Sequence, residues 1–280
     1  MPRSIAGLSI IVTGGARGIG RATVDRFARQ GAKVAIGDLD LDRANEVAGA
    51  YDGHVVAARL DVTDVSSWVS FLADVDHLGP WDVLVNNAGI MPLGSVLKET
   101  ESVARTIMDV NVHGVINGTK AVAPGMVDRG RGHLVNVASA VGRVAVPHGA
   151  TYSASKFAVV GFSEAIRQEL VGDGIDVTVI LPTVVQTELA AGVPAARGIK
   201  PVTAEDVAEV IEAAVLKPKA EMWVPRWTQG LGKSTLAMPR FVQDAMSRAT
   251  KAGDVLRSAD PAARAAYEQR ARRAAGTAEE

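Results

Sequence analysis

Residues 10–24 read IIVTGGARGIGRATV, an apolar run followed by a glycine-rich turn and the start of an amphipathic segment. The run predicts a buried strand, and Val24, Phe27 and Ala28 share one face of a predicted helix. The glycines let the chain turn tightly, bring backbone amides close to a pyrophosphate, and pack the helix against the strand. Because the positive end of the helix would face the phosphates, this stretch predicts a dinucleotide site. An ordinary strand-to-helix turn is the alternative, and the rest of the chain decides between the two.

The alternation of strand and helix continues along the chain. Short β-branched apolar runs occupy residues 10–12, 34–36, 54–56, 83–85, 134–137 and 177–180, and a further strand is expected at 221–224. Strands that alternate with helices predict βαβ units and a parallel sheet, and runs without polar alternation are typical of strands covered on both faces. We therefore expect an α/β fold of the Rossmann type, a doubly wound parallel sheet of about seven strands with helices on both faces and a C-terminal helical extension.

The amino-acid composition of the sequence changes after Pro225. Residues 1–225 are expected to form one Rossmann domain for dinucleotide binding and catalysis, and the basic, alanine-rich residues 226–280 a helical extension. One predicted helical face of this extension contains Phe241, Val242, Ala245, Met246 and Ala249. The extension could pack on a neighbouring subunit, cover the substrate site, or lie on an anionic membrane surface. A partly ordered, solvated tail is the remaining alternative.

Composition excludes several classes of protein. The net charge of -1 provides no basic field, so no nucleic-acid partner is expected. The chain has no cysteine and its five histidines lack ligand spacing, so no metal site is expected. The first residues lack the apolar region of a signal peptide, and no apolar run approaches the roughly 20 residues of a spanning helix. A cytoplasmic location is therefore expected.

Asp38 ends the second predicted strand, 18 residues after Gly20. A carboxylate there accepts hydrogen bonds from the adenosine ribose, and it would repel a 2′-phosphate 4 Å away by about 4 kcal/mol at an effective dielectric constant near 20. NAD is therefore expected rather than NADP. Arg17 favours NADP, because a guanidinium in this turn could bind a 2′-phosphate. Asp38 could also be only the N-cap of the next helix.

Tyr152 and Lys156 are four residues apart, so they lie on one face of a predicted helix. A phenol with a pKa near 10 is a poor base at neutral pH, but a nearby ammonium and a cationic nicotinamide favour the phenolate. The phenolate could then take the proton of an alcohol as hydride leaves. Ser139 follows the strand 134–137, at the carboxyl edge of the sheet, and could hold the substrate oxygen.

These motifs, with Asn86-Asn87-Ala88-Gly89 and Asn111, resemble those of the short-chain dehydrogenase/reductase family over residues 8–225. The resemblance implies an alcohol dehydrogenase or reductase that forms a homotetramer or homodimer. It also implies four catalytic roles: Tyr152 as the acid/base, Ser139 orienting the substrate oxygen, Lys156 binding the nicotinamide ribose and acidifying Tyr152, and Asn111 positioning a water for a proton relay.

The resemblance further implies a set of cofactor contacts. The expected contact residues are Gly14, Arg17, Gly18, Ile19, Gly20, Asp38, Asp61, Val62, Asn87, Ala88, Gly89, Tyr152, Lys156, Pro182, Val185 and Thr187. One departure concerns Thr183, which follows Pro182 where the family usually has glycine. If the backbone there were left-handed, threonine would cost on the order of 1–2 kcal/mol.

The segments expected over the nicotinamide are 90–93, 140–144 and 189–193, and most of their side chains are apolar. Within the second segment, Arg143 could bind an anionic substrate or be a solvated loop residue. A lipophilic secondary alcohol or ketone is therefore the expected substrate, with NAD as the acceptor. The alternatives are an NADPH-dependent carbonyl reductase and a non-catalytic regulatory protein that binds NAD.

Overall fold

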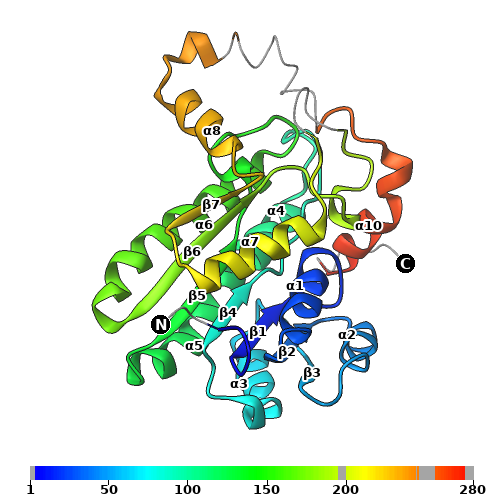
Figure 1. Cartoon of the computed structure of the whole chain (residues 1–280). Coiled ribbons are helices and arrows are strands. Elements are labelled where there is room, and N and C mark those ends of the chain that lie inside the picture. Colours follow the sequence, from blue (N-terminus) through cyan, green and yellow to red (C-terminus); the bar gives the residue numbers. More distant parts are fainter. Residues whose placement is uncertain (1–3, 195–199, 244, 246–255, 275–280) are drawn as a thin grey trace.

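The computed structural model describes residues 4–194, 200–243, 245 and 256–274. Seven parallel strands form one sheet in the order β3-β2-β1-β4-β5-β6-β7. Their bounds are β1 Ser9–Thr13, β2 Lys33–Asp38, β3 Val55–Arg59, β4 Val83–Asn86, β5 Gly132–Val137, β6 Ile175–Pro182 and β7 Glu221–Val224. Helices cover both faces of this sheet (Figure 1). The predicted Rossmann fold is thereby confirmed, with a third strand that begins at Val55 rather than His54.

The α-helices connect the strands and continue beyond them. Their bounds are α1 Gly18–Ala28, α2 Leu41–Ala48, α3 Val65–Asp74, α4 Glu101–Met108, α5 Gly114–Asp128, α6 Ala150–Leu170, α7 Ala204–Leu216, α8 Thr228–Ala237 and α10 Pro261–Ala274. Between α4 and α5 the chain forms a π-helical turn, Asp109–His113. Across the described residues, no helix has both the length and the apolar character needed to cross a membrane.

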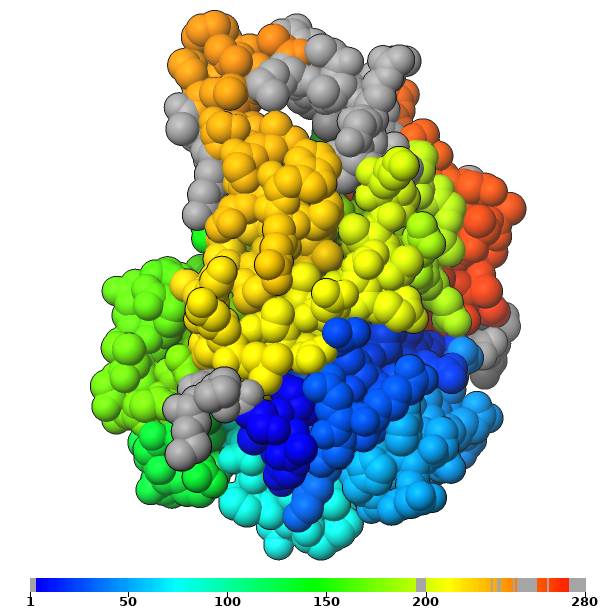
Figure 2. All heavy atoms as spheres, in the orientation of Figure 1, coloured from blue at the N-terminus to red at the C-terminus, as the bar shows by residue number. Residues whose placement is uncertain are grey.

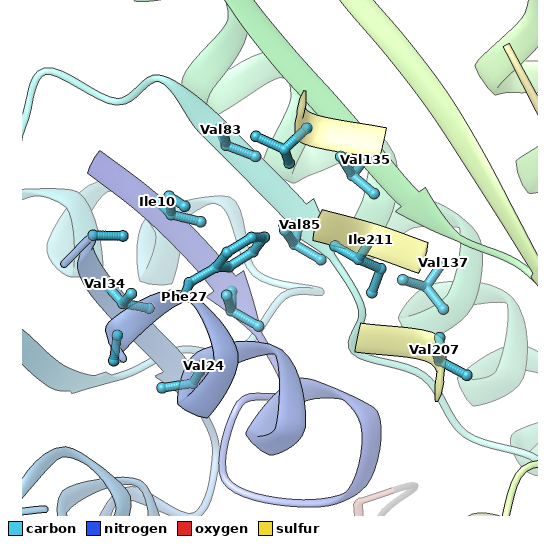
Figure 3. Packing of buried hydrophobic residues seen from close by; sticks show 14 of the residues in the cluster. Ile10, Val24, Phe27, Val34, Val83, Val85, Val135, Val137, Val207 and Ile211 are labelled. Carbon is cyan, nitrogen blue, oxygen red and sulfur yellow. The ribbon is translucent and has the colours of Figure 1, made fainter. Parts of the chain in front are cut away.

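The strands are buried on both faces, which explains their uninterrupted apolar sequences. In β1, Ile10 belongs to the core under α1 and α7, whereas its neighbour Ile11 belongs to the core under α3 and α5. Figure 3 shows the first core, in which Phe27 of α1 and Ile211 of α7 cover the sheet. Full burial of one such side chain contributes about 1.5–3 kcal/mol, so the sheet gives a rigid support to the loops at its edge.

The predicted extension is helical where the structure describes it. α8 follows β7 directly, and α10 packs against the short helix Glu188–Ala190 that follows β6 (Figure 2). The predicted apolar face of the tail extends to Met246 and Ala249, which lie outside the described residues. The division of the chain at residue 225 stays a prediction.

Candidate active site

A cavity of about 1160 Å³ opens at the carboxyl ends of the strands, where parallel sheets of this topology bind ligands. Segments after all of the first six strands line it. Among the predicted cofactor residues, Gly20 does not line the cavity, and among the predicted catalytic residues Asn111 does not; the others do. The sheet thus brings together residues that lie as far apart in the sequence as Gly14 and Thr187.

The glycine-rich turn has the backbone that its sequence predicts. Gly14 and Gly18 have positive φ angles of 66° and 49°, a region that disfavours other residues. Gly20 serves packing, because a Cβ there would lie 2.1 Å from the carbonyl oxygen of Gly14. The turn therefore presents bare backbone to the cavity, and this fits the pyrophosphate of a dinucleotide.

The end of β1 is joined to the loop after β4 by hydrogen bonds. The Thr13 hydroxyl accepts from the backbone amides of Asn87 and Ala88, each at 3.0 Å. The Asn87 side-chain amide in turn donates to the carbonyl oxygen of Thr13 at 2.9 Å and to that of Gly14 at 3.2 Å. These bonds fix the two sides of the crevice at the point where the strand order reverses.

Asp38 supports the same turn and is not a helix cap. Its carboxylate accepts from the backbone amides of Ala16 and Asp40, each at 3.0 Å. The N-cap of α2 is Asp40, whose side chain accepts from the amide of Arg43. The carboxylate of Asp38 therefore stays at the cavity wall, available to a ribose.

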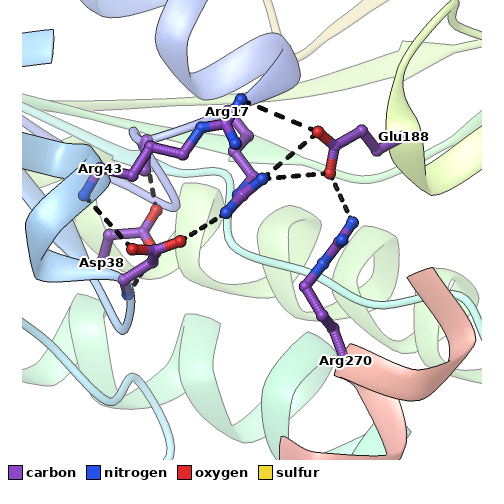
Figure 4. A network of polar contacts seen from close by, with 7 residues as sticks. Arg17, Asp38, Arg43, Glu188 and Arg270 are labelled. Atoms are coloured by element: carbon purple, nitrogen blue, oxygen red, sulfur yellow. Dashed lines mark hydrogen bonds and ion pairs between the residues drawn. The ribbon is translucent and has the colours of Figure 1, made fainter. Parts of the chain in front are cut away.

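Arg17 is held by acidic side chains (Figure 4). Its guanidinium pairs with Asp40, and at 3.3 Å with Glu188. The hydrogen bond from Arg17 keeps the pKa of Asp40 below its usual range. Glu188 also pairs with Arg270 of α10. Arg17 is thus already neutralised by carboxylates, which weakens its case as a 2′-phosphate ligand.

Tyr152 lies in the first turn of α6 and is 6% exposed. Ser139, which follows β5, lies near enough to this phenol to act against the rise in its pKa. The Ser139 hydroxyl also accepts from the amide of Val141 at 3.2 Å. Ser139 and Tyr152 thus line the same cavity, and their predicted catalytic roles stay predictions.

Lys156 lies one turn after Tyr152 and is 5% exposed. Its Nζ lies 5.8 Å from the centre of the Tyr152 ring and donates to the carbonyl oxygen of Val137 at 3.2 Å. Burial lowers the pKa of Lys156 to about 8. At neutral pH this lysine is therefore largely an ammonium, though less firmly so than an exposed one.

The expected acidification of Tyr152 is not a property of the chain alone. Burial raises the pKa of Tyr152 to about 12, although the hydrogen bond to Ser139 acts in the opposite direction. The cost of a charged phenolate in a dry pocket exceeds the help from its neighbours. The chain by itself therefore favours the neutral phenol of Tyr152.

Asn111 lies in the π-helical turn and is 1% exposed. Its side chain accepts from the amide of Ile90 at 2.8 Å and donates to the Ile90 carbonyl oxygen at 2.9 Å and the Ser155 hydroxyl at 3.0 Å. In this structure Asn111 anchors the loop after β4 to α6. Its implied role in positioning water stays a prediction.

The substrate side of the cavity is mostly apolar. From the three predicted segments, Ile90, Met91, Ala140, Val141, Arg143, Val144, Leu189, Ala190 and Val193 line it. The Arg143 guanidinium donates two hydrogen bonds to Glu221 of β7, at 2.7 and 3.0 Å. It is therefore neither a freely solvated group nor an unoccupied binding site for an anionic substrate.

The C-terminal extension supplies a further wall of this cavity, and none of its residues was among the predicted site residues. The extension residues that line it include Trp227, Leu231, Leu256 and Tyr267. Covering the substrate site was one of the alternatives for the tail, and the described part of the tail does so. The isolated apolar residues of 256–274 gave no signal that could have selected this alternative.

Thr183 is not strained. Among the described residues of the chain, the left-handed region holds one residue other than glycine, which is His148 with φ of 62°. The Thr183 amide and hydroxyl both donate to the carbonyl oxygen of Val224, at 2.9 and 3.2 Å. The penalty considered for threonine at this position therefore does not arise.

Comparisons with known proteins identify the family of the chain. The sequence model of the family described as short chain dehydrogenase matches residues 9–198. A 2,5-dichloro-2,5-cyclohexadiene-1,4-diol dehydrogenase, LinX of Sphingobium indicum, is 37% identical over 198 residues, which are 69% of this chain and 79% of the relative. A sorbitol dehydrogenase of Cereibacter sphaeroides is 37% identical over 191 residues, 68% of this chain and 75% of the relative.

Two solved structures are similar in fold. A short chain dehydrogenase from Burkholderia cenocepacia in complex with NADP has a TM-score of 0.77 and 28% identity, and covers 87% of this chain and 98% of its own. A short chain dehydrogenase/reductase from Burkholderia phymatum in complex with NAD has a TM-score of 0.75 and 24% identity, with 82% and 93% covered. The second likeness concerns the fold alone.

Proposed function

We propose that this chain, which belongs to the short-chain dehydrogenase family, is an NAD-dependent oxidoreductase that interconverts a lipophilic secondary alcohol and its ketone. The observation that carries the proposal is that Tyr152, Ser139 and Lys156 line one cavity, with the Lys156 ammonium 5.8 Å from the centre of the Tyr152 ring, and that the substrate side of this cavity is mostly apolar. A protein that only binds a nucleotide has no need of this arrangement.

Each residue has a defined task in this proposal. Ser139 holds the substrate oxygen by a hydrogen bond, and Tyr152 accepts the alcohol proton or returns it to the ketone oxygen. Lys156 favours the charged phenol by its positive charge. A nicotinamide bound beside these groups supplies the acceptor for the hydride of the alcohol.

The choice of NAD rests on the charges around the second strand. Asp38 presents its carboxylate to the cavity, and Arg17 is paired with Asp40 and Glu188. A 2′-phosphate would have to approach one acidic group and displace two others from Arg17, which is costly. An NADPH-dependent reductase is the alternative, since one of the similar structures is described with NADP.

The choice of a lipophilic substrate rests on the lining of the cavity. The relatives named above include enzymes for a chlorinated cyclic diol and for sorbitol, so they do not by themselves favour an apolar substrate. Burial of apolar substrate surface against an apolar lining favours binding by roughly 25 cal/mol per Å². The same lining offers few hydrogen-bond partners for the hydroxyl groups of a polyol.

The test is a panel of alcohols with NAD and, separately, with NADP, followed by the absorbance of the reduced nicotinamide. The panel contains 2-octanol, cyclohexanol and sorbitol. Turnover of the first two with NAD is expected, and exclusive turnover of sorbitol would contradict the apolar substrate. The Tyr152→Phe variant should lose turnover by about 10²–10⁴-fold while it retains NADH binding. A variant that stays active would exclude Tyr152 as the acid/base.

A further inference from the structure

Helix α10 meets the substrate side of the cavity through one buried arginine. Arg264 is 3% exposed, although it lies on a helix whose neighbouring side chains Ala263 and Ala265 are exposed. Its Nη2 donates to the carbonyl oxygen of Met91 at 2.7 Å. Its Nη1 donates to the carbonyl oxygens of Leu189 and Ala191 at 3.0 and 3.2 Å.

These carbonyls belong to two different loops. Met91 follows β4, whereas Leu189 and Ala191 follow β6, and both loops supply apolar lining to the substrate side. The planar guanidinium can hold all three oxygens at once because its donors point in fixed directions. Glu268, one turn further along α10, accepts from Nε of Arg264 at 3.0 Å and compensates its charge.

Tyr267 adds a second link between α10 and the loop after β4. The backbone amide of Met91 donates to the Tyr267 hydroxyl at 2.6 Å, and the guanidinium of Arg264 lies 5.1 Å from the centre of the Tyr267 ring. Tyr267 lines the same cavity as Tyr152, and burial raises the pKa of its phenol above the usual value.

The tail also touches the start of the catalytic helix and the cofactor side. Leu256 is buried against Gly149, because a Cβ atom added to Gly149 would lie 2.7 Å from Cδ1 of Leu256. At the other end, Arg270 pairs with Glu188, which also holds Arg17 of the glycine-rich turn (Figure 4). The tail thus contacts the loops after β4 and β6 and the residue that precedes α6.

We propose that α10 is a fixed wall of the substrate site, with Arg264 as the positioning residue that holds the two substrate loops together and Tyr267 as the side chain that limits the length of the substrate. The proposal deepens the function proposed above, and its substrate-dependent part rests on that function. No other chain is required, because the wall comes from the same polypeptide.

The first test needs no substrate. Hydrogen exchange is measured by mass spectrometry on the wild type, Arg264→Met, Arg264→Lys and the control Gln269→Ala, which changes an exposed side chain of α10. Peptides that cover residues 89–94 and 187–193 should exchange at least tenfold faster in both Arg264 variants and as in the wild type in the control. Lysine should not rescue the arginine, because its single nitrogen cannot occupy the two separate positions from which Nη1 and Nη2 reach the two loops. Unchanged exchange would overturn the proposal.

A second variant covers the case in which the Arg264 variants do not fold. Tyr267→Phe removes only the hydroxyl, so the Met91 amide loses its acceptor and should exchange at least tenfold faster. Unchanged exchange at Met91 in this variant would contradict the link.

The third test uses a series of 2-alkanols from 2-butanol to 2-undecanol with NAD. Tyr267→Ala should move the best substrate to a longer chain, whereas Tyr267→Phe, which keeps the ring, should retain the wild-type optimum. Arg264→Lys should raise KM for the alcohol at least tenfold and change kcat and the Kd of NADH less than twofold. An unchanged optimum in Tyr267→Ala would exclude Tyr267 as the limit. If no alcohol or ketone of the series reacts, the proposed function fails, and the exchange data still decide whether α10 is a clamped wall.

Discussion

The ammonium of Lys156 lies 5.8 Å from the centre of the Tyr152 ring, and burial acts on the two groups in opposite directions. It raises the pKa of Tyr152 to about 12 and lowers that of Lys156 to about 8. In both cases burial favours the neutral form. The pair is therefore held away from the phenolate–ammonium state that alcohol oxidation requires, and the cofactor charge must shift it.

The first prediction concerns the pH dependence of activity. Oxidation needs the phenolate of Tyr152, so its kcat/KM should rise with pH, whereas ketone reduction needs the neutral phenol and should fall. A unit charge about 6 Å away contributes about 3 kcal/mol at an effective dielectric constant near 20. Lys156→Met should therefore move the rising limb of oxidation upward by about one to two pH units. The measurement is kcat/KM from pH 6 to 10, and an unmoved limb would remove Lys156 from this role.

The second prediction concerns folding stability and pH. Between pH 8 and 10.5 the unfolded chain keeps the Lys156 proton while the native chain has lost it, so the free energy of unfolding should rise with pH. Below pH 8 the native chain buries a charged Lys156, so the loss of folding stability that this burial causes is fully present there. The gain is about 3 kcal/mol in total. Above pH 10 the native chain retains the Tyr152 proton longer than the unfolded chain, which lowers stability again. Urea unfolding of the wild type and Lys156→Met across this range measures the difference, and parallel curves would contradict the buried ammonium.

The third prediction concerns cofactor preference. Asp38→Asn removes the negative charge and keeps an acceptor for one of the two amides of Ala16 and Asp40, which bond to different oxygens of the Asp38 carboxylate. The Kd of NADH should rise about tenfold and that of NADPH should fall, because the repulsion of the 2′-phosphate is lost. Asp42→Asn, which alters an exposed carboxylate in the first turn of α2, is the matched control for net charge. Equal shifts in both variants would show a long-range charge effect instead of a local contact. The readout is nicotinamide fluorescence.

The fourth prediction concerns Glu188, the carboxylate that Arg17 and Arg270 share (Figure 4). Glu188→Gln should leave Arg17 with Asp40 as its paired carboxylate, so NADPH should bind about fivefold tighter. The melting temperature should change little, since partly exposed ion pairs contribute about 0–1 kcal/mol each. Titrations with NADPH at low and high salt provide the check. Weaker NADPH binding at both salt concentrations would contradict the expected gain in positive charge.

The sequence predicted the sheet and most of the cavity because both follow from local signals. Apolar runs such as 10–12 mark strands buried on both faces, and the glycines of the first turn need conformations that other residues avoid. The wall formed by α10 could not be predicted in this way. Arg264 is one of many arginines in an alanine-rich tail. It differs from a solvated arginine in its hydrogen bonds to backbone carbonyl oxygens of loops far away in the sequence, which only the folded structure reveals.

The pKa of Tyr152 shows a second limit of sequence reasoning. The spacing to Lys156 indicates a favourable charge, but the desolvation that opposes it depends on how completely α6 is covered. In the same way, the sequence allowed Asp38 to be the N-cap of α2, whereas the folded backbone places Asp40 in that position.

The fifth prediction concerns Thr183, where the family pattern has glycine. The threonine hydroxyl donates to the carbonyl oxygen of Val224, and its backbone is not left-handed, so glycine has nothing to relieve there. Thr183→Gly should lower the free energy of unfolding by about 1–2 kcal/mol, through the lost hydrogen bond and the greater freedom of glycine in the unfolded chain. NADH binding should not improve. Thr183→Ser keeps the hydroxyl and should retain most of the stability. Urea unfolding and NADH titration of the two variants give the measurement, and a stabilised Thr183→Gly would mean that threonine strains the loop after β6 after all.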